Sequence, residues 1–403
     1  MATTVSDAGA APLRLPAAAP RNARVRKVAT LRGHKDRVWC VRWCPTAAVL
    51  ASCSGDATVR LWSRQHNTAA SSGGSGESAG EGEGEGGWRC IGTLEGEHSR
   101  TIRHISWSPS GEYIACASFD HTATVWRRNV DSDDFTFEVE GLLDGHESEV
   151  KCVEWATDSM LITCSRDHTA WVWERVGEGE YECGGVLTGH VQDVKHCEFI
   201  LPQNDHDVPL ATTCGYDNTI KIWSEGHQRD DWQCTQTLTA HEATVWATAL
   251  QKLEVPMDEV RAAHESQALL PQPLLCSCSD DLSVIVWKRN AEGRFVEVSR
   301  TSGFAERSLF DLDWAPHNAP VVACASGDNS FALIGVYADS EGVHSCTIAR
   351  VEDAHLADVN TVSFASHGNL LSSATDASGD GVLLATGGDD SVVHLWRVCA
   401  DTE

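Results

Sequence analysis

Short runs of alternating apolar and polar residues recur along this chain in pairs, and a polar turn separates the two runs of each pair. In residues 161–174, LITCSRDHTAWVWE, the first run ends at Cys164, the turn occupies residues 165–167, and the second run ends in Trp173. A period of two on both sides of a tight turn predicts a β-hairpin. A Gly-His pair that ends at His146 precedes this hairpin.

The same arrangement occurs seven times, and each copy carries an aspartate in its turn: Asp56, Asp120, Asp167, Asp217, Asp281, Asp328 and Asp390. Successive turn aspartates are 47 to 64 residues apart, against roughly 40–45 residues for one blade of a β-propeller. Insertions at 67–87, 253–273 and 365–381 account for the excess, and we expect the first to be disordered. Seven repeats predict an all-β, seven-bladed β-propeller over residues 23–399, because a closed ring leaves only short, protected strand edges.

Closing such a ring requires one blade that combines both ends of the repeat region. Residues 25–31 form a lone alternating run, and we expect this run to supply the outer strand of the blade that ends at Trp396. The Ala/Pro-rich residues 1–22 lack the apolar core of a secretory signal, so they are predicted to be a disordered tail. Residues 400–403 form a short C-terminal tail in this interpretation.

The net charge of −27 limits the classes of partner. Phosphates would be repelled at long range, so neither nucleic acid nor an anionic membrane is expected as a partner. No apolar run approaches the roughly 20 residues that a transmembrane helix needs. We therefore expect protein partners and a cytoplasmic location, with the nucleus as a second one.

Sixteen cysteines raise the alternatives of disulfides or a metal site. Several stand three residues before a turn aspartate, where other copies have alanine or glycine: Cys53, Cys164, Cys214 and Cys278. A small buried residue is required at that position, and a free cysteine meets the requirement. Ligands spaced by the repeat period do not suit a metal cage, whose ligands converge on one point. We expect reduced structural thiols, no metal and no cofactor.

Four polar positions recur with the repeat: the histidine, a hydroxyl residue four positions before the turn aspartate, the aspartate itself, and a tryptophan six positions after it. The copies with a full set contain His34, Ser52, Asp56 and Trp62; His146, Thr163, Asp167 and Trp173; His190, Thr213, Asp217 and Trp223; His241, Ser277, Asp281 and Trp287; and His355, Thr386, Asp390 and Trp396. A Ser/His/Asp group can hydrolyse esters and amides. A nucleophile occurs once rather than in five copies, so we interpret these groups as buried hydrogen-bond networks and expect no catalytic residue.

Two copies depart from this pattern. The second copy has Cys116 at the hydroxyl position, which predicts an incomplete network. The sixth copy has Phe304 and Ile334 where histidine and tryptophan are expected, and it is predicted to be the weakest blade.

These Gly-His and tryptophan positions resemble those of the WD-repeat propellers. The turn triplets SGD, SFD, SRD, GYD, SDD, SGD and GDD, together with RTIRHISWSPSGEYIACASFD, GHESEVKCVEW and VQDVKH, are similar to the cytosolic iron–sulfur assembly WD-repeat family. The resemblance covers nearly all of residues 28–396. It implies a non-catalytic scaffold that binds no cluster through a cysteine motif. Such a scaffold bridges a hydrogenase-like iron–sulfur carrier, a small targeting adaptor and a helical-repeat scaffold to apo iron–sulfur clients.

Two sets of residues are expected to open onto one face of the ring. One precedes the turn aspartates and the other lies near the start of each strand after the Gly-His loop. From these sets we predict the partner-binding residues Arg166, Arg103, Lys151, Lys195, Phe119, Tyr216, Trp39 and Trp246. Arginine binds carboxylates through two hydrogen bonds, and aromatic side chains act as desolvated anchors. The resemblance also implies a functionally important arginine at the SRD position, which is Arg166.

An alternative for this patch is that its cations only balance nearby acids, namely Glu149, Asp193 and Asp120. Another WD-repeat platform, such as a ubiquitin-ligase substrate receptor or a reader of histone tails, is the alternative for function. A ligase receptor is expected to carry Trp-Asp-x-Arg, whereas Trp62 is followed by Ser63 and Trp126 by Arg127. A histone reader would present an acidic face, and this cluster is basic.

Overall fold

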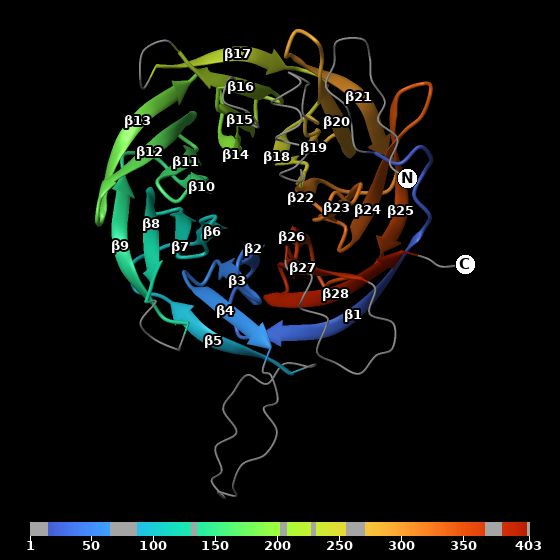
Figure 1. The fold of residues 1–403 in the computed structure, drawn as a ribbon. Coiled ribbons are helices and arrows are strands. Elements are labelled where there is room, and N and C mark those ends of the chain that lie inside the picture. The colour runs from blue at the N-terminus through green and yellow to red at the C-terminus, as the bar shows by residue number, and fades with distance from the viewer. Residues whose placement is uncertain are drawn as a thin grey trace, which may run out of the picture.

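A computed structural model describes residues 15–64, 87–129, 135–201, 208–226, 231–254, 271–366 and 381–400. Within these ranges 28 strands form seven four-stranded antiparallel sheets, arranged as blades around a central axis (Figure 1). The predicted all-β, seven-bladed propeller is confirmed. No helix in the described ranges is long and apolar enough to cross a bilayer.

Each blade runs from an inner strand at the axis to an outer strand at the rim (Figure 1). The first four blades, in that order, contain β2 (Val38–Trp43), β3 (Val49–Ser54), β4 (Val59–Arg64) and β5 (Trp88–Leu94); β6 (Ile102–Trp107), β7 (Tyr113–Ser118), β8 (Thr122–Arg128) and β9 (Phe137–Asp144); β10 (Val150–Thr157), β11 (Met160–Ser165), β12 (Thr169–Gly177) and β13 (Glu180–Thr188); and β14 (Val194–Ile200), β15 (Leu210–Gly215), β16 (Ile220–Glu225) and β17 (Trp232–Leu238).

The fifth and sixth blades follow the same plan. They contain β18 (Val245–Leu250), β19 (Leu275–Ser279), β20 (Ser283–Arg289) and β21 (Phe295–Ser302); and β22 (Leu309–Trp314), β23 (Val321–Ser326), β24 (Phe331–Ala338) and β25 (Val343–Val351).

The seventh blade combines the two ends of the chain. It contains β26 (Val359–Phe364), β27 (Val382–Gly388) and β28 (Val392–Ala400), and its outer strand is β1 (Ala23–Arg32). The register pairs Lys27 with Trp396 and Leu31 with Val393. Leu31 is buried in a cluster that also holds residues of the first blade. The predicted closure by the N-terminal strand is therefore confirmed.

Packing between blades explains the pattern of buried and exposed residues along the strands. The second strand of a blade, such as β11, is buried almost throughout because neighbouring blades cover both of its faces, whereas the outer strand β13 alternates between exposed and buried residues. Between the second and third strands, the residue after the turn aspartate takes a left-handed conformation, as at His168 with φ of 72°. The Asp167 carboxylate accepts the backbone N–H of Thr169 at 2.9 Å, which fixes the tight turn.

Part of the predicted N-terminal tail packs on the ring instead. Residues 15–22 are described, and Leu15 is buried among residues of the fifth and sixth blades. The Pro16 carbonyl accepts a hydrogen bond from the backbone N–H of Ala338 at 2.9 Å. The Pro20 ring packs so closely on Gly335 that a Cβ at that position would lie only 2.7 Å from it. The prediction of disorder over all of 1–22 is wrong for this segment, because one leucine has apolar surface between two blades to cover. Residues 1–14 and 401–403, and most of each predicted insertion, lie outside the described residues.

Candidate functional site

Each repeated polar group forms a chain of hydrogen bonds across its blade. In the third blade the Trp173 indole N–H donates to Thr163 at 2.8 Å, and Thr163 contacts Nε2 of His146 at 2.9 Å. Nδ1 of His146 lies 2.7 Å from the Asp167 carboxylate. Because the carboxylate only accepts, His146 donates from Nδ1 and accepts the threonine proton at Nε2. The same chain joins the predicted groups of the first, fourth, fifth and seventh blades.

The second blade has a complete network, contrary to the prediction from Cys116. Nε2 of His98 lies 2.9 Å from the Thr124 hydroxyl, and the Trp126 indole donates to the same oxygen at 3.1 Å. Thr124 lies on β8, and its register partner on β7 is Cys116. The hydroxyl has moved from one strand to the position directly opposite on the next strand, a substitution that a search within one strand overlooks.

The sixth blade replaces this network with apolar contacts. Phe304 and Ile334, at the positions of histidine and tryptophan, are buried in one core cluster. The turn carboxylate of Asp328 instead pairs with Arg350 at 3.2 Å. The hydroxyl groups of Thr163 and its equivalents are buried and bonded to tryptophan and histidine. The repeated networks therefore hold the blades together, and their hydroxyl groups are not exposed nucleophiles.

A bulge at the start of every inner strand determines which residues form the predicted binding face. The pairing of inner and second strands shifts at one residue in each of the seven blades: Trp39, Arg103, Lys151, Lys195, Trp246, Phe310 and Asn360. A bulged residue is unpaired, and the bulge re-aims its side chain. These residues lie where the second set was predicted, near the start of each strand after the Gly-His loop, so the bulges give all seven the same place in the strand pairing.

Cations and aromatic rings alternate along this face from the first to the fifth blade. The Arg103 guanidinium lies 4.9 Å from the centre of the Trp39 ring, and the Lys151 ammonium lies 4.0 Å from that of Phe119. The Lys195 ammonium lies 3.7 Å from the ring of Tyr216. Contacts of this kind hold cations against rings while leaving hydrogen-bond donors available. The structure thus brings seven of the eight predicted residues into cation–aromatic contacts, the seventh being Trp246, which lies 5.1 Å from Lys195.

Arg166 is the exception, because it contacts an acid rather than a ring. Its guanidinium lies 3.4 Å from Glu149, which also pairs with Arg100 at 3.4 Å. Burial opposes ionisation of Glu149, but the Ser148 hydroxyl and the charges of Lys151 and Arg166 lower its pKa to about 2. The Arg166 side chain remains 57% exposed, so one carboxylate shared by two arginines leaves it donors for a partner.

The two lysines of this face are held partly out of water. Burial, together with the positive charges of Lys151 and Arg103, lowers the pKa of Lys195 to about 8, and Asp193, 3.6 Å away, partly opposes this shift. Burial likewise lowers the pKa of Lys151. The alternative that local acids balance these cations applies in part to Arg166 and Lys195. Asp120 does not balance a cation of this face, because its carboxylate is bonded to His98 at 3.0 Å.

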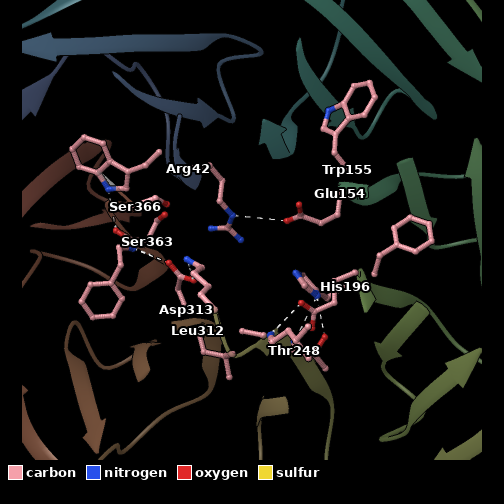
Figure 2. A pocket seen from close by; sticks show the side chains of 16 residues that line it. Arg42, Glu154, Trp155, His196, Thr248, Leu312, Asp313, Ser363 and Ser366 are labelled. Carbon is pink, nitrogen blue, oxygen red and sulfur yellow. Dashed lines mark hydrogen bonds and ion pairs between the residues drawn. The ribbon is translucent and has the colours of Figure 1, made fainter. Parts of the chain in front are cut away.

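A second polar site lies inside the central channel, and the sequence patterns did not indicate it. A cavity of about 250 Å³ is lined by charged side chains that include Arg42, Glu154, Glu198, Lys252 and Asp313. Figure 2 shows Arg42 extending from one side of this cavity toward Glu154 on the other. These residues occupy the fifth position of the inner strands or lie beyond it. They therefore lie about 10 Å along the channel from the cation–aromatic face, at about 3.3 Å per residue.

Comparison with known proteins supports the same architecture. The family model described as "WD domain, G-beta repeat" matches residues 25–63, 88–127, 137–174, 181–224 and 346–397. The chain is 31% identical over 308 residues to "Probable cytosolic iron-sulfur protein assembly protein 1" of Kluyveromyces lactis, covering 74% of this chain and 82% of that protein. It is 29% identical over 435 residues to the protein of the same description from Aspergillus terreus, covering 90% and 96%. The protein of that description from Vanderwaltozyma polyspora is 28% identical over 322 residues, covering 75% and 82%.

Proposed function

This chain belongs to the WD-repeat family and, within it, to the cytosolic iron–sulfur protein assembly proteins, and from that membership we propose that it is a non-catalytic scaffold of this assembly machinery. It bridges a hydrogenase-like iron–sulfur carrier, a small targeting adaptor and a helical-repeat scaffold to apo client proteins. The setting is the cytoplasm, with the nucleus as a second location. The buried hydroxyl groups of the repeated networks favour a binding role over catalysis.

The cation–aromatic face carries this proposal. Arg103, Lys151, Arg166 and Lys195 place four cations on one side of a chain whose net charge is −27. Three of the four lie against aromatic rings, which gives them apolar surroundings and a fixed position. A ligand that offers carboxylates together with an apolar side chain matches this combination. Its carboxylates would bind cations that are already partly removed from water, and its apolar side chain would pack beside the rings. We assign the face to an acidic segment or C-terminal carboxylate of a client or partner.

Charge reversal at Arg166 tests this assignment. Arg166→Glu is expected to weaken pull-down of iron–sulfur clients by at least about tenfold, since it removes one charged hydrogen-bonding group and places a repulsive one beside Glu149. Arg307→Glu is the matched control, because Arg307, which precedes the sixth blade, is 61% exposed and pairs with Asp358 at 2.8 Å. Both variants should retain the wild-type melting temperature. Undiminished client binding by Arg166→Glu would contradict the site assignment.

Affinity purification with mass spectrometry separates this function from other WD-repeat platforms. Recovery of iron–sulfur assembly components that is lost in Arg166→Glu and retained in Arg307→Glu supports the scaffold. Recovery of ubiquitin-ligase subunits or histones in their place would favour the alternative platforms.

A further inference from the structure

The third residue of every inner strand follows the bulge, and these seven residues stand at one level of the ring: Cys40, His104, Cys152, His196, Ala247, Asp311 and Thr361. The inner strands of successive blades surround one axis (Figure 1). Residues more than forty positions apart are therefore brought together at this level. Four metal-ligating side chains occupy it in the first four blades, which no network or binding contact described above requires.

Three of them gather tightly with a glutamate two residues further along β10. His104, Cys152, Glu154 and His196 each present one ligand atom, and these four atoms all lie within 4.8 Å of one another. Nδ1 of His104 lies 3.6 Å from the Cys152 sulfur and donates to the Val153 carbonyl at 3.1 Å. Nε2, which is 3.9 Å from Glu154, is therefore the His104 nitrogen that an ion would bind. The two histidines and the cysteine are buried.

We propose that His104, Cys152, Glu154 and His196 form a binding site for one divalent transition-metal ion such as Zn²⁺ or Fe²⁺. Two imidazoles, a thiolate and a carboxylate are a donor set that such ions accept in four-coordinate sites. Bond lengths of about 2.0–2.3 Å place the ligand atoms of a tetrahedral site roughly 3.5 Å apart. The present separations, of up to 4.8 Å, exceed that value, so the side chains must move closer together by roughly 1 Å to hold an ion.

Neighbouring groups orient two of these side chains. The Ser106 hydroxyl donates to Glu154 at 2.6 Å. The Thr248 hydroxyl lies 3.4 Å from Nδ1 of His196, which leaves Nε2 for an ion. Partners of this kind fix ring orientation and carboxylate rotamer in known metal sites.

Carboxyl groups outnumber lysine and arginine side chains around the cluster. Arg42 pairs with Asp311 at 3.2 Å, and Lys252 pairs with Asp313 at 2.7 Å. Glu154 and Glu198 are then in excess, and Oε1 of Glu198 is a buried oxygen with no hydrogen-bond partner in the described part of the chain. Glu154 and His196 also line the cavity of about 250 Å³, which provides a path for the ion (Figure 2).

Arg42 is the group that competes with an ion at this place. Its guanidinium lies 3.0 Å from Nε2 of His104 and 4.0 Å from Glu154. An ion that takes these contacts leaves Arg42 paired with Asp311. If the guanidinium holds the cluster permanently, the four residues form only a hydrogen-bonded network and bind no metal.

Metal loading of the full-length protein decides between these two states. After treatment with a chelator, the protein is incubated with Zn²⁺ or Co²⁺, separated from free ion and analysed for bound metal. We expect one ion per chain, together with a sulfur-to-cobalt charge-transfer band in the Co²⁺ form. Less than about a tenth of an equivalent on the folded wild-type protein, or bound Co²⁺ without that band, would overturn the proposal.

Variants locate the ion. Cys152→Ser should abolish the charge-transfer band and lower metal affinity by at least about tenfold, since loss of even an outer-shell partner has that effect. Cys278→Ser is the control, because Cys278 is an equally buried thiol of the fifth blade outside the cluster, and it should bind like wild type. Should Cys152→Ser not fold, the partly exposed Glu154→Gln takes its place and must show the same loss of affinity. Unchanged affinity in a folded ligand variant would refute the site.

Discussion

At the scale of single residues, Lys195 combines two properties that are seldom found together. It is positioned over Tyr216 at 3.7 Å, and burial together with Lys151 lowers its pKa to about 8. An ordinary lysine, with a pKa near 10.4, stays charged throughout the physiological range. Lys195 instead becomes deprotonated at a pH slightly above neutral, so the charge of the binding face depends on pH.

This property predicts a pH-dependent affinity for acidic partners. The charged form of Lys195 predominates below its pKa of about 8, so binding should be strongest near pH 7 and weaken as pH rises to 9. Affinity measured by calorimetry over this range checks the prediction. Lys195→Arg, whose guanidinium stays charged, should remove the pH dependence. A wild-type affinity that is equal at pH 7 and pH 9 would exclude a direct role for Lys195.

A second residue-scale prediction concerns the relocated hydroxyl of the second blade. Thr124→Val preserves shape but leaves His98 and Trp126 without their shared partner. It should destabilise the protein by roughly 2 kcal/mol, the penalty for buried polar groups that lose a hydrogen bond. Chemical denaturation measures this loss, and Thr163→Val in the third blade should lose a similar amount because its hydroxyl joins the same two residue types. A stability unchanged by Thr124→Val would mean that the second blade does not depend on the network.

At the scale of elements, the outer strand β1 determines whether the ring is closed. Its residues pair with β28 along their whole length, apart from one bulge between Lys27 and Ala29. Ala29 and Leu31 are buried. Without β1, the seventh blade would expose the edge of β28 and the apolar surface between the seventh and first blades.

Deletion of residues 24–31 should therefore destabilise the whole propeller by at least about 3 kcal/mol, from lost apolar burial and unpaired backbone groups. The melting temperature of the deletion variant measures the effect. Deletion of residues 2–12 is the control, since these residues precede the packed Leu15. Equal melting temperatures for wild type and the 24–31 deletion would contradict the closure by β1.

At the scale of the whole molecule, the turn aspartates link stability to pH. Burial opposes ionisation of Asp56, Asp167, Asp217 and Asp281, but their histidine, hydroxyl and backbone donors hold their pKa values far below the ordinary range. A carboxylate whose pKa is lower in the folded state contributes stability above its unfolded-state pKa of about 3.9. That contribution is lost as pH falls through the folded-state value.

We expect a stability maximum in mildly acidic solution. From pH 7 toward the isoelectric point near 4.9, the self-repulsion of the −27 charge decreases and the melting temperature should rise slightly. Below about pH 4 the unfolded chain binds protons that the folded aspartates do not, so their contribution to stability decreases and the melting temperature should fall steeply. Thermal unfolding between pH 3 and pH 7 measures both limbs, and Asp167→Asn should make the acid limb less steep. A melting temperature that stays constant down to pH 3 would show that these carboxylates contribute little.

The sequence by itself determined the repeat, the seven blades, the closure by β1 and the members of five of the repeated polar groups. Alternation, turn chemistry and spacing are local, and a repeated pattern states the same local fact seven times. Phe119, Arg166 and Tyr216 could be placed on one face for the same reason, because each precedes a turn aspartate.

Only the tertiary structure decided which side chains meet. The Thr124 hydroxyl replaces Cys116 across two paired strands, and Glu149 reaches Arg166 from another loop. The expectation that repeat spacing keeps cysteines away from other ligands does not hold for Cys152. The inner strands of successive blades face one axis, so His104, Cys152 and His196 converge there although the chain separates them. Such contacts depend on ring geometry and strand register, which a pattern along one chain does not contain.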